Sequence, residues 1–142
     1  MNTKQFLVLG LILIVVVLLF NNKSESFNNT GYQFNIEKAV NELETILCLM
    51  VNCRHCQKFK LMSNEQIKSE LGIPNHIKFT KVIHNGPNDN ASQSIFSRFG
   101  VNSAPTLVIY SPSTGLFNKV YPSKELIMEH VKKLLNDIKN KL

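Results

Sequence analysis

The stretch ILCLMVNCRHCQKF, residues 46–59, places two thiols, Cys53 and Cys56, three residues apart where an apolar run gives way to a helical pattern. Residues 46–51 form a short, continuous apolar run of the kind that builds buried strands. Beyond Cys56, apolar residues recur among lysines as on an amphipathic helix: Phe59, Leu61 and Met62. This stretch predicts a strand, a sharp turn and a helix, with Cys53 at the helix N-terminus.

The predicted position of Cys53 favours an anionic sulfur. Unpaired N–H groups and the dipole at a helix N-terminus stabilise a thiolate. Arg54 and His55 add positive or proton-donating groups beside it, a setting in which reactive cysteines occur. Cys56, one helical turn further on, is well spaced to attack a mixed disulfide on Cys53. The pair therefore predicts thiol–disulfide exchange.

Two other roles for the cysteine pair are a structural disulfide and half of a metal site. Zinc usually has four ligands, and the remaining cysteine and histidines show no paired ligand spacing: Cys48, His76, His84 and His130. We expect no metal. Cys48 lies inside the apolar run and is expected to be a buried, unreactive thiol. The three histidines outside the motif are expected to face solvent.

Composition narrows the function further. The net charge of +6 comes from Lys and Arg spread along the 142 residues without a basic block, which is unfavourable for nucleic-acid binding. Three cysteines close together are too few for the disulfide framework of a small secreted protein, and this favours redox chemistry or metal binding.

The N-terminal region predicts a membrane anchor. Residues 6–20 contain no polar side chain and follow a short tail, residues 1–5. As a helix they would extend about 22 Å, so spanning a ~30 Å hydrocarbon core requires the flanking lysines Lys4 and Lys23 to snorkel. A cleaved signal peptide is the alternative, although no good cleavage site follows.

The distribution of charge around this segment predicts its orientation. Positive charge on the N-terminal side favours a cytosolic N-terminus. A polar linker, residues 21–35, then leads to a domain formed by residues 36–142. We expect a single-pass protein whose domain lies on the non-cytosolic side of a cellular or viral membrane.

Residues 36–142 alternate helical and strand patterns, which predicts an α/β domain. A first helix, capped by Asn35, would carry Ile36, Val40, Leu43 and Leu47 on one face. Further along the chain we expect a strand at 77–83, a short helix capped by Asn90 and ended by Gly100, strands at 106–110 and 116–121 joined as a hairpin, and a closing helix with Ile127, Val131, Leu134, Ile138 and Leu142 on one face. This order implies a mixed sheet of about four strands flanked by helices.

A second motif supports a family assignment. Together with the Cys-x-x-Cys stretch, the segment FGVNSAPTL, residues 99–107, resembles the thioredoxin-like superfamily, including protein disulfide isomerase-like domains, around its cis-proline. The resemblance implies a thioredoxin fold with Cys53 as nucleophile, Cys56 as resolving thiol and Pro105 as the cis-proline. The Ala104 backbone would then pair with an extended substrate. No cofactor is implied beyond the dithiol; the partners would be protein thiols or disulfides and a redox partner.

The chain also departs from the family pattern. His55 stands where protein disulfide isomerases and periplasmic oxidants have histidine, which implies an oxidising pair. Asn52 replaces an aromatic residue, and Leu47 replaces a buried carboxylate that many members use to move the proton of the resolving cysteine. These departures leave open a redox-inactive interaction module and, less favoured, a metal carrier using Cys53, Cys56 and a histidine.

Overall fold

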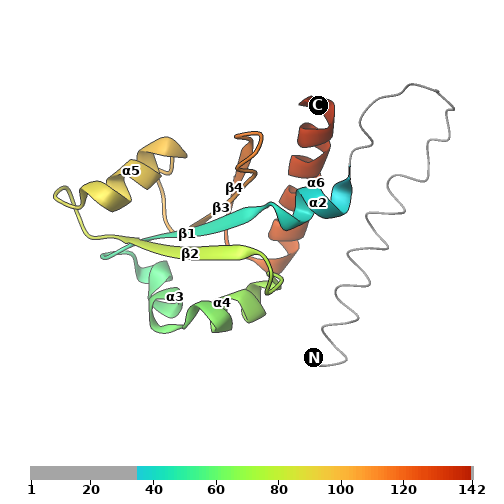
Figure 1. Cartoon of the computed structure of the whole chain (residues 1–142). Coiled ribbons are helices and arrows are strands. Elements are labelled where there is room, and N and C mark those ends of the chain that lie inside the picture. The colour runs from blue at the N-terminus through green and yellow to red at the C-terminus, as the bar shows by residue number, and fades with distance from the viewer. Residues whose placement is uncertain (1–34, 142) are drawn as a thin grey trace, which may run out of the picture. The chain divides into compact units, whose positions relative to one another are not determined.

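Four strands form one mixed sheet in the computed structural model, which describes residues 35–141 (Figure 1). Their order is β2-β1-β3-β4. β1 runs parallel to β2 and antiparallel to β3, and β4 is antiparallel to β3. The bounds are β1 Glu44–Met50, β2 Lys78–His84, β3 Thr106–Tyr110 and β4 Phe117–Val120. The predicted mixed sheet flanked by helices is confirmed.

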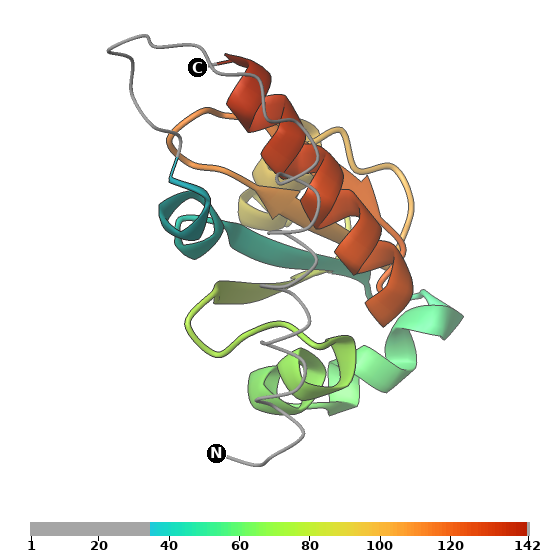
Figure 2. The same cartoon turned by 90° about the vertical axis from the view of Figure 1, so that its right-hand side faces the viewer.

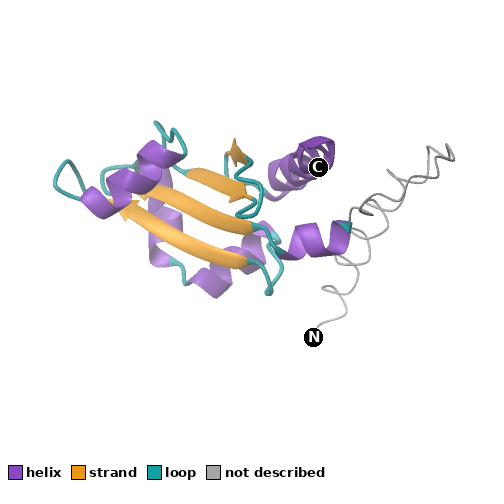
Figure 3. Cartoon of the chain, turned by 45° about the horizontal axis from the view of Figure 1, so that its top comes forward, coloured by secondary structure: helices purple, strands orange, loops and turns teal. Residues whose placement is uncertain are grey.

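Helices cover both faces of the sheet. Successive side chains of a strand point to opposite faces, and in β1 both sets are apolar and pack against helices. Leu47 and Leu49 pack in one cluster with the helices α3 (Gln57–Leu61), α4 (Asn64–Leu71) and α6 (Lys124–Lys141). Ile46 and Cys48 pack in another cluster with α5 (Asn90–Arg98). Figures 2 and 3 show α5 on the face opposite to α3 and α4. Both layers are apolar, and they fix β1 at the centre of the molecule.

The first helix, α2 (Ile36–Asn41), is shorter than predicted. Asn35 is its N-cap, as expected, and its side chain accepts the Lys38 N–H at 2.9 Å. Leu47, which fits both that helical spacing and the strand predicted at residues 46–51, lies in β1 opposite Leu107 of β3, so the predicted strand is confirmed. Pairing with two neighbouring strands satisfies the backbone there, and that tertiary gain outweighs the helical spacing.

The helix predicted after Cys56 is broken in two. Met62 has an extended backbone, and Ser63 begins α4 with a capping box to Gln66. Lys81 of β2 occupies the break, where its Nζ donates to the Met62 carbonyl at 2.8 Å. The break leaves Leu61 87% exposed, so the prediction that Leu61 lies on the apolar face was wrong.

The later elements follow the predicted order with one corrected cap. The hairpin of β3 and β4 and the closing helix α6 are confirmed. The N-cap of α5 is Asp89, not Asn90: its carboxylate accepts the Ser92 N–H at 3.2 Å. A charged acceptor at a helix N-terminus is stabilised by the helix dipole, which favours Asp89 over the neighbouring amide.

The predicted anchor, residues 6–20, lies outside the described residues. None of the helices within residues 35–141 has the length and hydrophobicity of a membrane span.

Candidate active site

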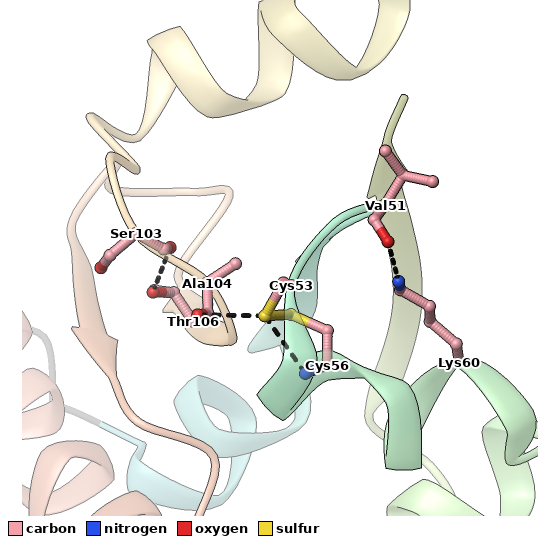
Figure 4. The surroundings of a disulfide bond; sticks show 7 residues. All are labelled: Val51, Cys53, Cys56, Lys60, Ser103, Ala104 and Thr106. Atoms are coloured by element: carbon pink, nitrogen blue, oxygen red, sulfur yellow. Dashed lines mark hydrogen bonds between the residues drawn. A yellow bond between two sulfur atoms is a disulfide. The ribbon is translucent and has the colours of Figure 1, made fainter. Parts of the chain in front are cut away.

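Cys53 and Cys56 are joined as a disulfide just beyond the C-terminal end of β1 (Figure 4). Their Cα atoms are 5.2 Å apart. Cys53 is the N-cap of η1, a three-residue 3-10 turn (Arg54–Cys56) that leads directly into α3. Cys56 is fully buried, whereas Cys53 is partly exposed. A partner can therefore reach the sulfur of Cys53 and not that of Cys56.

Two backbone groups lie against the Cys53 sulfur. The Cys56 N–H donates to Cys53 Sγ at 3.1 Å, which would stabilise a thiolate once the disulfide opens. The Ala104 carbonyl oxygen lies 3.4 Å from Cys53 Sγ. In the disulfide this second distance is a contact, because only a reduced thiol has a proton to donate. The predicted position of Cys53 at the start of a helical turn is confirmed.

The segment before β3 brings the second motif to the first. The Ala104–Pro105 peptide bond is cis, as the resemblance implied. Pro105 is buried, and Thr106 Oγ1 donates to the Ser103 carbonyl at 2.8 Å across this turn (Figure 4). Two segments 51 residues apart thus meet at Cys53. Pairing of the Ala104 backbone with a substrate stays a prediction.

The layer beneath the disulfide is apolar. Leu47 and Cys56 belong to the same buried cluster, together with Phe59. Among residues 35–141 no carboxylate is buried. Leu47 is fully buried where the resemblance places a carboxylate, so the part of the chain that the structure describes holds no buried acid to move the Cys56 proton.

Arg54 and His55, predicted to tune the thiolate, are exposed. Within the described part of the chain, neither side chain makes a hydrogen bond or an ion pair, so the structure does not bring these side chains onto the Cys53 sulfur. Their effect on Cys53 would be that of nearby charge, and it stays a prediction.

Sequence reasoning missed Lys60. Its ammonium donates to the Val51 carbonyl in the loop that precedes Cys53 (Figure 4). The Val51 N–H in turn donates to the His84 carbonyl at 3.0 Å, which extends the pairing of β1 and β2 to the edge of the site. Lys60 follows Cys56 at the i+4 spacing of a helix, and that spacing was the one available signal.

The other cysteine and the histidines are placed as follows. Cys48 is fully buried, as predicted, and burial raises the pKa of its thiol to about 11. The expectation that His84 and His130 face solvent was wrong: both are half-buried. His84 Nδ1 lies 2.7 Å from Ser92 Oγ, because the strand alternation of β2 turns His84 toward α5.

Metal ligands are not grouped in this domain. Within residues 35–141 no three His, Cys, Asp or Glu side chains are placed to hold a metal ion.

The sheet order, the cysteine pair after β1 and the cis-proline before β3 together give these residues a thioredoxin-like architecture.

Comparisons with known proteins give the following similarities. Neither a protein-family model nor a curated protein sequence matches the chain. Among solved structures it is similar to the oxidised thioredoxin of Plasmodium falciparum, at 14% identity and a TM-score of 0.40 over 75% of this chain and 92% of that one. A thioredoxin of Thermus thermophilus is 18% identical, with a TM-score of 0.42 over 72% and 78% of the two chains. The DsbH oxidoreductase is 17% identical, with a TM-score of 0.42 over 82% and 96%.

Proposed function

We propose that this chain is a membrane-tethered thiol–disulfide oxidoreductase that exchanges disulfides with proteins through Cys53 and Cys56. The observation that carries the proposal is the asymmetry of the pair. Cys53, a partly exposed residue, is bonded to the fully buried Cys56, and the Ala104 carbonyl lies against the Cys53 sulfur. This arrangement supports reaction at one sulfur and resolution by the other.

The chemistry balances in two exchange steps. In the reduced protein the Cys53 thiolate attacks a sulfur of a client disulfide, the client S–S bond breaks, and one client thiolate leaves. The Cys56 thiolate then attacks Cys53 Sγ, which restores the Cys53–Cys56 disulfide and releases the second client thiolate. Two electrons pass from the protein dithiol to the client; the reverse sequence oxidises a client dithiol.

The tether is the second part of the proposal. It rests on the apolar residues 6–20 and the polar linker that follows them. An anchor would confine the domain to a membrane surface on the non-cytosolic side, where disulfides persist. No cofactor and no nucleic acid are part of this function.

The test is an activity assay on the purified full chain in a non-ionic detergent. We expect the wild type to reduce insulin disulfides in the presence of dithiothreitol and to oxidise a reduced, unfolded protein. The matched control is the Cys53→Ser, Cys56→Ser double variant. Activity no greater than that of the double variant in either direction would refute the proposal.

One observation favours a second function, an anchored interaction module without redox turnover. Leu47 is fully buried in the same apolar cluster as Cys56, and no carboxylate within residues 35–141 is buried. The same assay separates the two functions, because an interaction module would match the double variant.

A further inference from the structure

The surface around Cys53 carries uncompensated positive charge. Two segments meet there, residues 51–61 and residues 102–106. A third segment, residues 121–123, lies beside the start of β3 because Val120 pairs with Leu107. None of these segments contains Asp or Glu. The first contains four residues that are basic or can become so: Arg54, His55, Lys58 and Lys60.

The four residues differ in whether their charge is already satisfied. Lys58 pairs with Glu70 of α4, and Lys60 donates to the Val51 carbonyl. Arg54 and His55 are exposed and make no such contact with any described residue. Lys124 and Glu125, the first charged residues after the segment 121–123, have opposite signs and offset each other. A net positive charge therefore remains directly beside Cys53.

Several lysines elsewhere in the domain pair their ammonium groups with carboxylates or backbone carbonyls. Lys38 and Lys78 form ion pairs with carboxylates, and Lys68, Lys81 and Lys119 donate to backbone carbonyls. Arg54 differs from these lysines because it has no such partner among the described residues and because it lies next to Cys53.

We propose that the clients of this domain carry an acidic residue next to the cysteine that reacts with Cys53, and that Arg54 binds this residue. The inference rests on the proposed function and names its substrate class. Arg54 is adjacent to Cys53, so in a mixed disulfide the neighbour of the client cysteine lies within reach of its guanidinium. A guanidinium binds a carboxylate with two parallel hydrogen bonds, and a protonated His55 adds attraction of the same sign.

The experiment uses three short peptides that differ only beside a single cysteine, which is flanked by Asp, Ser or Lys. Each cysteine is activated as a mixed disulfide with thionitrobenzoate. The Cys53 thiolate of the reduced full chain, in non-ionic detergent, attacks the peptide sulfur, and thionitrobenzoate leaves as a coloured thiolate. The leaving group is common to all three peptides, so the ratio of rates reports only the flanking charge.

We expect the Asp peptide to react about three- to tenfold faster than the Lys peptide at low ionic strength. The ratio should fall toward one in about 1 M salt, because screening shortens the range of the interaction. Arg54→Glu should reverse the order of the peptides. Lys38→Glu makes the same change in net charge on α2, at the opposite end of β1, and should leave the ratio unchanged.

Each outcome bears on one proposal. Equal rates for the three peptides with the wild type would overturn the inference and leave the proposed function standing. A ratio that Lys38→Glu lowers as much as Arg54→Glu does would overturn the assignment to Arg54, since net charge alone would explain it. Release from no peptide would instead contradict the proposed function. Should Arg54→Glu lose its native circular dichroism, Arg54→Gln replaces it, with an expected ratio near one.

Discussion

At the scale of single residues, burial separates the three cysteines. Cys48 and Cys56 are both fully buried, and Cys53 alone offers its sulfur to a partner. The Cys56 N–H lies 3.1 Å from that sulfur and supplies part of the stabilisation that a thiolate needs. The reactivity of the pair should therefore be one-sided.

This one-sidedness predicts the result of trapping. A Cys56→Ser variant should accumulate disulfide-linked adducts with client proteins that contain a disulfide. The Cys53 thiolate attacks the client S–S bond and one client thiolate leaves, and without Cys56 no neighbouring thiol resolves the mixed disulfide. Non-reducing electrophoresis, with and without a reducing agent, measures the adducts. The matched variant is Cys53→Ser, which should trap few, since Cys56 is buried. Equal trapping by the two variants would contradict the assignment of roles.

Cys48 predicts a pH dependence of stability. Its pKa is raised by burial to about 11, above the value of about 8.5 expected in the unfolded chain. A raised pKa means that the neutral thiol supports the fold at low pH and that this support is lost as pH rises toward 11. Between pH 8 and pH 10 the wild type should lose about 1.5–2 kcal/mol more stability than Cys48→Val. Urea unfolding of the oxidised full chain at both pH values measures the difference; parallel losses would show that Cys48 ionises freely.

At the scale of elements, one lysine joins the sheet to the helices that carry the site. Lys81 of β2 donates to the carbonyls of Phe59, Lys60 and Met62 at 3.4, 3.5 and 2.8 Å. These carbonyls end α3, where intrahelical donors are missing. Lys81 therefore stabilises the C-terminal end of α3 at its break from α4, and α3 in turn supports Cys56.

Replacing this lysine should weaken the helix end. Lys81→Met keeps the stem and removes the donor, which should cost about 1–3 kcal/mol because partly buried carbonyls lose their partner. Lys119→Met removes a comparable donor, to the Gly100 carbonyl, from an exposed site and should cost less than about 0.5 kcal/mol. Urea unfolding of the two variants in detergent compares them. A smaller loss for Lys81→Met than for Lys119→Met would refute the role of Lys81.

At the scale of the whole molecule, the domain carries the disulfide and the predicted anchor would provide membrane attachment. Within residues 35–141 the helices serve the sheet and the disulfide, and none of them could cross a membrane. We propose that the apolar residues 6–20 attach the domain to the membrane.

Fractionation tests this attachment. The full chain should remain with membranes after alkaline carbonate extraction, because an apolar helix inserts far more firmly than a surface charge binds. Deletion of residues 1–20 should move the protein to the supernatant. As a control, Lys132→Glu with Lys133→Glu removes positive charge from α6 and should leave the full chain in the pellet. Release of the full chain by carbonate would contradict an anchor.

Local sequence patterns were sufficient to predict several elements of the fold. Alternation and propensity identified β2, β3, β4 and α6, and the Cys-x-x-Cys and cis-proline segments were recognisable because each is a contiguous motif. Asn35 was correctly assigned as a cap, since its hydrogen bond reaches only three residues along the chain. Such features are encoded over a few residues and do not depend on distant partners.

Contacts between residues far apart in the sequence could not be predicted and became visible only in the folded domain. The break after α3 depends on Lys81 of a distant strand, and the early end of α2 depends on the pairing of β1 with β2 and β3. Lys60 donates to the Val51 carbonyl, whereas the Arg54 side chain has no partner among the described residues. Both side chains carry the same charge, so the sequence alone does not show this difference. The physical reason is that partners far apart in sequence compete for the same polar groups, and the folded chain settles that competition.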